Sequence, residues 1–113
     1  LPKKAVPKPD YDAETSLYLP GKYTSTVQLG NDHADVEVVV DSSDILSIRL
    51  VNLSQTVTAM YPLVEPCMDT LAKQICEKQS LEGITYPDEN RYTSQLLLGA
   101  IDAALQKATY PQT

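Results

Sequence analysis

Several kinds of side chain are scarce or missing in this 113-residue chain. Tryptophan and phenylalanine are absent, and seven tyrosines are the only aromatic residues. One histidine and two cysteines are too few for a disulfide framework, and His33 lies too far along the chain from Cys67 and Cys76 to suggest a metal site. The cysteine spacing puts the two thiols on nearly opposite faces of one helix, so we expect two separate small apolar side chains. No apolar run approaches the roughly 20 residues that a membrane-spanning helix needs.

Basic side chains are also in short supply. Nine Lys and Arg against fifteen Asp and Glu give a formal net charge of -6 at pH 7. A surface of that sign repels nucleic-acid phosphates and anionic lipid headgroups, so we expect no nucleic-acid partner and no direct membrane insertion of this domain. What the chain does have is a globular balance of 42% hydrophobic and 21% charged residues, which predicts one domain with its own core.

Prolines divide the chain into two parts. Four of the eight prolines lie in residues 1–20, together with lysines and aspartates. This composition favours extended backbone over packed elements, so we interpret residues 1–20 as a linker or tether and residues 21–110 as the domain. Because the chain begins with Leu1 rather than Met, we expect a processed piece, which leaves room for a signal peptide or lipid anchor upstream.

The first half of the predicted domain has the two-residue period of β-strands. Segments 22–29, 35–40 and 45–53 are rich in β-branched residues and are separated by turn residues at 30–32 and 41–44. Short connections of this kind predict an antiparallel meander with one buried face. In the third segment the alternation predicts that three apolar side chains share the buried face: Leu46, Ile48 and Leu50.

The second half has the 3.6-residue period of helices. A first helix is predicted after Met60, with Pro62 or Pro66 in its first turn. A second helix is predicted to begin with Thr93 or Ser94 as its N-cap. Strands followed by helices predict an α+β fold, here an antiparallel β-meander with two helices packed on one face. The apolar stripes consist of Val64, Met68, Leu71 and Ile75 in the first helix, and of Leu97, Ala100, Ile101, Ala104, Leu105 and Ala108 in the second.

The order of these parts carries a resemblance to a known family. The segments concerned are G-K-Y-T-S at 21–25, V-E-V-V-V at 36–40, I-L-S-I-R-L at 45–50, Q-T at 55–56, Q-S at 79–80, D-E-N-R-Y-T-S at 88–94 and A-I-D-A-A-L-Q-K-A at 100–108. Together they resemble the FMN-binding domain family, which occurs in the periplasmic flavin-carrying subunit of the sodium-translocating NADH:quinone reductase and in related bacterial envelope proteins. The resemblance covers residues 21–108.

The resemblance also implies where a covalent flavin would be attached. Family members use the motif S-G-A-T-x-T-S, in which a phosphodiester joins FMN to the hydroxyl of the first Thr. Here Asp88, Glu89 and Asn90 take the positions of the small residues, and Arg91 takes that of the acceptor. Arginine has no hydroxyl to accept the flavin, and two carboxylates oppose an incoming phosphate. The attachment motif is degenerate, and we expect no covalent FMN.

Non-covalent FMN stays open as an alternative. In that case Arg91 pairs with the phosphate beside the free amides of a helix start, and tyrosine rings stack on the flavin. The structural interpretation is simpler: the arginine balances a neighbouring carboxylate, the hydroxyls cap the helix and the tyrosines are half-buried packing residues. The candidate cofactor-binding residues are Arg91, Tyr92, Thr93, Ser94, Tyr23 and Thr56.

The resemblance therefore implies one favoured function and one alternative. The favoured function is that of a cofactor-free structural or ligand-sensing module in a bacterial envelope protein, placed outside the cytoplasmic membrane, tethered to it and working with a protein partner in the envelope. The alternative is an electron-transfer module that binds FMN non-covalently. No residue pattern indicates catalysis, so we expect at most a flavin-dependent electron carrier and assign no catalytic residue.

Overall fold

The computed structural model describes residues 18–109. Residues 1–17 of the predicted linker and residue 110 of the predicted domain lie outside the described residues. The elements are β1 (Gly21–Leu29), β2 (Asp32–Val40), β3 (Ile45–Val51), α1 (Gln55–Met60), α2 (Val64–Lys78), the 3-10 turn η1 (Asp88–Asn90) and α3 (Arg91–Ala108).

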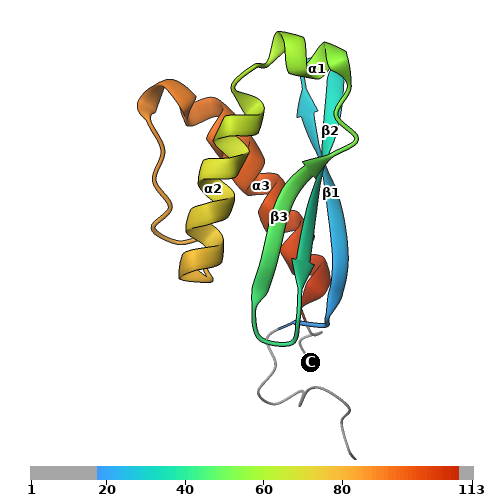
Figure 1. Ribbon diagram of the computed structural model, residues 1–113, viewed down its shortest axis with the longest axis vertical. Coiled ribbons are helices and arrows are strands. Elements are labelled where there is room, and N and C mark those ends of the chain that lie inside the picture. The colour runs from blue at the N-terminus through green and yellow to red at the C-terminus, as the bar shows by residue number, and fades with distance from the viewer. Residues whose placement is uncertain (1–17, 110–113) are drawn as a thin grey trace, which may run out of the picture.

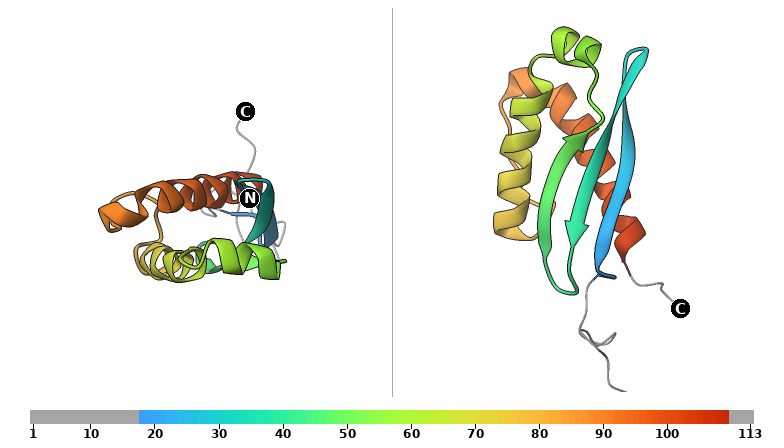
Figure 2. Two further views of the ribbon diagram at one scale, coloured as in Figure 1. Left: turned by 90° about the horizontal axis from the view of Figure 1, so that it is seen from above. Right: turned by 45° about the vertical axis from the view of Figure 1, so that its right-hand side comes forward.

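The strands form one antiparallel sheet in the order β1-β2-β3, and two long helices cover one of its faces (Figure 1). α3 packs across β1 and β2, whereas α2 runs beside β3 (Figure 2). The short helix α1 lies at one end of the sheet, against β2. This arrangement confirms the predicted α+β fold with its antiparallel meander and two helices on one face.

The covered face of the sheet is apolar along the whole of its central strand, β2. In β2 the inward residues are an alanine and three valines, from Ala34 to Val40, and each is at most 2% exposed. The predicted stripes of both helices are buried against them, including Leu71 and Ile101 at 0% exposure. Burial of each such aliphatic side chain contributes roughly 1.5–3 kcal/mol, so this single interface supplies most of the driving force for folding.

One prediction for β3 is wrong, because the strand contains a bulge. Val39 pairs with Ser47 but Val40 pairs with Ile45, which leaves Leu46 without a partner across the sheet. The extra residue reverses the alternation, so Ile45 is buried at 3% exposure whereas Leu46 is 54% exposed. Ile48 is buried and Leu50 half-buried on the covered face, as the period of two predicts.

The sequence pattern did not reveal α1. Ser54 is its N-cap and accepts a hydrogen bond on Oγ from the Val57 N–H at 3.1 Å. The helix has six residues and only Val57 is buried, so it is too short to show a periodic apolar stripe. α2 then begins at Val64, with Pro66 in its first turn.

The two ends of the described chain meet. Tyr18 forms an isolated antiparallel bridge with Thr109, and the Leu19 N–H donates to the Ala108 carbonyl at 2.7 Å. The Tyr18 N–H donates to the Ser42 carbonyl at 3.2 Å, which fixes the same segment to the β2–β3 turn. Burial raises the pKa of the Tyr18 phenol, and the charge of nearby Asp44 adds to this shift.

Gln79 joins the end of α2 to the start of β3. Its backbone is left-handed (φ 57°), and its N–H closes the helix on the Ile75 carbonyl. Its side chain pairs with both backbone groups of Ile45: Oε1 accepts from the N–H at 2.6 Å and Nε2 donates to the carbonyl at 3.0 Å. Nε2 also donates to the Cys76 carbonyl at 2.7 Å. The Gln79 side chain therefore makes the two backbone hydrogen bonds that a neighbouring strand would make to Ile45 at the edge of β3.

We expect Gln79→Ala to lower the free energy of unfolding by about 2 kcal/mol, because backbone groups at Ile45 lose partners in a half-buried place. Gln106→Ala is the matched control: Gln106 is an exposed residue of α3 whose side chain bonds only Asp102, and its loss should change stability by at most about 0.5 kcal/mol. Urea denaturation of both variants measures the difference. Equal stability of the two variants would contradict the role given to Gln79.

Candidate functional site

The six predicted cofactor-binding residues are spread over the molecule. Tyr23 lies on β1 and its hydroxyl donates to the Leu19 carbonyl at 2.9 Å, beside the C-terminal end of α3. Arg91 begins the same 18-residue helix, roughly 25 Å away at 1.5 Å per residue. Thr56 is exposed on α1. The structure therefore brings together only the four consecutive residues from Arg91 to Ser94.

These four residues face different surroundings at the start of α3. Tyr92 is 75% exposed, and Arg91 approaches Asp88 at 3.6 Å in an ion pair whose side chains are 63% and 96% exposed. Thr93 is half-buried, whereas Ser94 is fully buried. An exposed ion pair of this length contributes little to stability.

The predicted N-cap role of Thr93 or Ser94 is wrong. α3 begins at Arg91, directly after η1, and Asn90 occupies the N-cap position without a side-chain capping bond. Thr93 and Ser94 therefore lie inside the first turn. The sequence contained a signal for Ser94, because it stands three residues before Leu97 and so continues the apolar stripe of α3.

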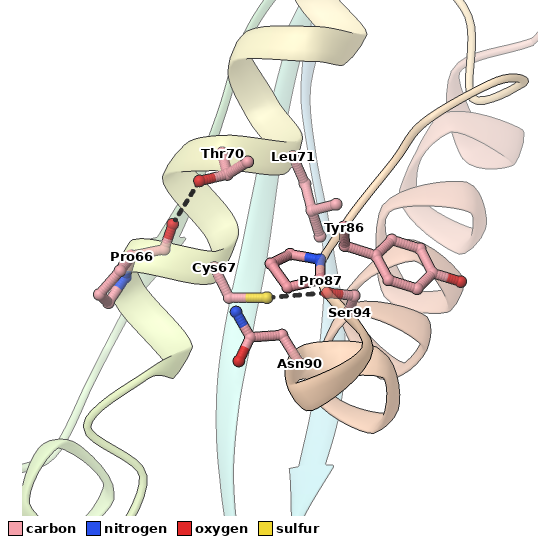
Figure 3. A pocket seen from close by; sticks show the side chains of 8 residues that line it. All are labelled: Pro66, Cys67, Thr70, Leu71, Tyr86, Pro87, Asn90 and Ser94. Carbon is pink, nitrogen blue, oxygen red and sulfur yellow. Dashed lines mark hydrogen bonds between the residues drawn. The ribbon is translucent and has the colours of Figure 1, made fainter.

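Ser94 belongs to a pocket between α2 and the start of α3 (Figure 3). The pocket has a volume of about 150 Å³. One wall comes from α2 and the other from the segment that leads into α3. The residues are Pro66, Cys67, Thr70 and Leu71 in the first wall, and Tyr86, Pro87, Asn90 and Ser94 in the second. Of the segment 88–94, only Asn90 and Ser94 line the pocket.

A buried contact joins the two walls. Cys67 Sγ and Ser94 Oγ lie 3.0 Å apart, and these residues are 5% and 0% exposed. Either atom can donate, so both polar groups are satisfied without water. Thr70 turns its hydroxyl away from this contact and donates to the Pro66 carbonyl at 3.1 Å. The sequence predicted Cys67 only as a small apolar side chain. Its contact with Ser94 could not be predicted, because it depends on how α2 and α3 pack together.

Asn90 supplies the unusual group of the pocket. In Figure 3 its side chain extends toward Cys67, with the amide nitrogen next to Cys67 and the oxygen on the other side. Among residues 18–109, its Oδ1 is the only buried side-chain oxygen or nitrogen that has no hydrogen-bond partner. A buried acceptor left unsatisfied costs roughly 1–3 kcal/mol. Oδ1 itself is covered, so only a rotation of the Asn90 side chain would present it to a donor in the pocket. No sequence signal identified Asn90, because an asparagine before a helix is most often a cap.

The charges around the pocket are mainly negative. Asp88 and Glu89 are exposed just before α3, and Arg91 is the one cation within this short segment. No group of three or more His, Cys, Asp or Glu side chains capable of holding a metal ion occurs in the part of the chain that the structure describes. The arrangement is a small, partly apolar space beside a buried acceptor, and it offers little to a phosphate.

No protein-family model, curated protein or solved structure matches this chain. Between residues 18 and 109, no helix is both long and apolar enough to cross a membrane. The resemblance to the FMN-binding family thus stays a prediction from the sequence motifs at 21–108.

The two thiols of α2 should differ in reactivity. Both are free, and burial raises the pKa of the Cys76 thiol, so less thiolate is present near neutral pH than for an unperturbed cysteine. We expect the alkylation rate of Cys76 in the Cys67→Ser variant to rise with pH with a midpoint above the usual value of about 8.5. In the Cys76→Ser variant we expect Cys67 to react more slowly still, because Cys67 is only 5% exposed and its sulfur contacts Ser94 Oγ.

Iodoacetamide labelling followed by mass spectrometry measures both rates, and labelling in concentrated urea gives the unprotected reference for each thiol. A folded-state rate for Cys67 equal to its rate in urea would contradict the packing described for the pocket.

Proposed function

We propose that the chain is a degenerate FMN-binding-type module without covalent flavin, which acts as a ligand-sensing domain of a bacterial envelope protein. In this proposal it lies outside the cytoplasmic membrane, tethered to it, and passes the signal to a protein partner in the envelope. The observation that carries the proposal is the small pocket between α2 and the start of α3, one of whose lining residues, Asn90, holds a buried Oδ1 without a hydrogen-bond partner.

The size of the pocket argues for a ligand smaller than a flavin. Pockets for drug-sized ligands have volumes of about 300–1,000 Å³, and FMN belongs to that size class. The volume of about 150 Å³ found here is close to that of an engineered cavity that binds benzene. A single six-membered ring with one small substituent is therefore the largest rigid molecule that we expect to fit without rearrangement.

The residues that line the pocket also restrict the chemical class of the ligand. Leu71, Pro66 and Pro87 offer apolar surface. Asn90 Oδ1 has no hydrogen-bond partner, and in this proposal the side chain rotates to present it when a donor binds. The neighbouring carboxylates disfavour an anion. We therefore propose a small neutral ligand with an apolar body and one hydrogen-bond donor, such as a phenol or a small cyclic alcohol.

Ligand binding here would affect the position of α3. One wall belongs to α2 and the other to the segment that leads into α3. A molecule that contacts both walls stabilises the arrangement in which they are correctly spaced. In this proposal, sensing depends on the ligand binding more tightly to one spacing of α2 and α3 than to others.

The favoured function and its flavin-binding alternative give different results with the purified protein. We expect no visible flavin absorption, a mass equal to that of the unmodified chain, and no quenching of FMN fluorescence on addition of the protein. A mass increase of one FMN, or saturable quenching, would favour an electron carrier and contradict the proposal.

Phenol and toluene test the ligand class, because they have similar size and only phenol donates a hydrogen bond. One hydrogen bond contributes about 0.5–1.5 kcal/mol, so we expect phenol to bind roughly 2-fold to 10-fold more tightly, as measured by thermal unfolding at increasing ligand concentrations. In Asn90→Leu the preference for phenol should disappear, whereas Glu89→Gln, outside the pocket, should retain it. Equal affinity of the unaltered protein for the two compounds, or no binding of either, would refute the proposed site.

A further inference from the structure

The outer edge of β3 is available for pairing along most of its length. β3 is a terminal strand of the sheet, and within residues 18–109 the backbone of Leu46–Val51 makes no hydrogen bond to any element other than β2. Gln79 satisfies only Ile45, at the beginning of the strand. Unpaired N–H and C=O groups on a sheet edge are a template for another extended segment.

A groove follows this edge between β3 and α2. It has a volume of about 170 Å³, and Arg49, Leu50, Glu65, Met68 and Asp69 line it. Met68 is 2% exposed and Leu50 is half-buried, so these two residues give the groove an apolar floor. The groove lies away from the pocket at Asn90 and shares no lining residue with it.

The exposed wall of the groove is acidic. Glu65 and Asp69 stand four residues apart on α2, both are exposed, and neither forms an ion pair within the described part of the chain. Like charges one turn apart repel each other on a helix. Arg49 does not neutralise them, because its Nε donates to Glu37 Oε1 at 2.8 Å.

We propose that the edge of β3 and this groove bind an extended peptide segment of a partner protein that carries Lys or Arg at alternate positions. The peptide adds a fourth strand by main-chain hydrogen bonds to Leu46–Val51, and its basic side chains meet Glu65 and Asp69. The spacing of the charges agrees on the two sides. Glu65 and Asp69, four residues apart on a helix, are separated by a rise of about 6 Å, and alternate residues of a strand are about 6.6 Å apart. The apolar stems of the basic side chains cover Met68 and Leu50.

The opposite edge of the sheet does not offer the same site. On β1 the Thr24 carbonyl already accepts a hydrogen bond from Lys107 Nζ at 2.6 Å. Lys22 and Lys107 place positive charge at this edge, which repels a basic peptide. The difference in charge between the two edges selects β3.

Fluorescence anisotropy with a labelled, capped peptide of sequence TVKVKVT tests the proposal on the full chain. We expect saturable binding, weaker binding at high salt, and no binding of the acidic peptide TVEVEVT. Methylation of the peptide nitrogens on the side that pairs with β3 should abolish binding, whereas methylation on the other side should not. Amide hydrogen exchange should slow in Leu46–Val51 and remain unchanged in β1.

Two pairs of substitutions distinguish binding to the carboxylates of the groove from attraction by the overall negative charge of the protein. Glu65→Gln with Asp69→Asn should weaken binding about tenfold, the effect of losing two partly exposed charge pairs. Glu82→Gln with Asp102→Asn makes the same change in net charge at exposed positions outside the groove and should leave the affinity unchanged. Thermal unfolding checks that all variants are folded.

Three results would overturn the proposal: no saturable binding of TVKVKVT, equal weakening by both pairs of substitutions, or equal binding of the two methylated peptides. Sedimentation of the free protein adds a fourth. Self-association with slowed exchange in Leu46–Val51 would show that a second copy of this chain, rather than a partner's peptide, occupies the edge.

Discussion

The three-stranded sheet is stable because two helices pack against one of its faces. The valines of β2 lie at the centre of that face, and α2 and α3 both pack against it. Three strands alone bury too little apolar area, and two helices alone would expose their stripes to water. Every other feature depends on this interface, since it fixes where α2 and α3 approach each other to form the pocket and where α2 borders β3 to form the groove.

The sequence was sufficient to predict this interface but not its irregularities. Alternation in β2 and the stripes of α2 and α3 are local periodic signals, and each was confirmed by burial. The bulge at Leu46 could not be seen, because an unbroken period of two fits the same residues. The six residues of α1 are too few for a helical period, and its N-cap Ser54 resembles any serine in a loop.

The sequence pointed to few of the residues that line the pocket. Of the six candidate residues, only Ser94 lies in its wall. The chemistry expected there centred on Arg91 and Tyr92, both of which extend into solvent. The groups that face the pocket, Asn90 and the pair of Cys67 with Ser94, come from segments far apart in the chain. Such a convergence is a property of packing and leaves no local sequence pattern.

The bridge between Tyr18 and Thr109 has a consequence for how this domain can be combined with other chains. Because Tyr18 and Thr109 are adjacent, a short connection between these two residues would close the backbone of 18–109 into a ring without disturbing the core. The exposed turn at Gly30 and Asn31 then offers a place to open that ring. The same adjacency makes the fold compatible with insertion into a surface loop of a host protein, whose own two halves would remain close together.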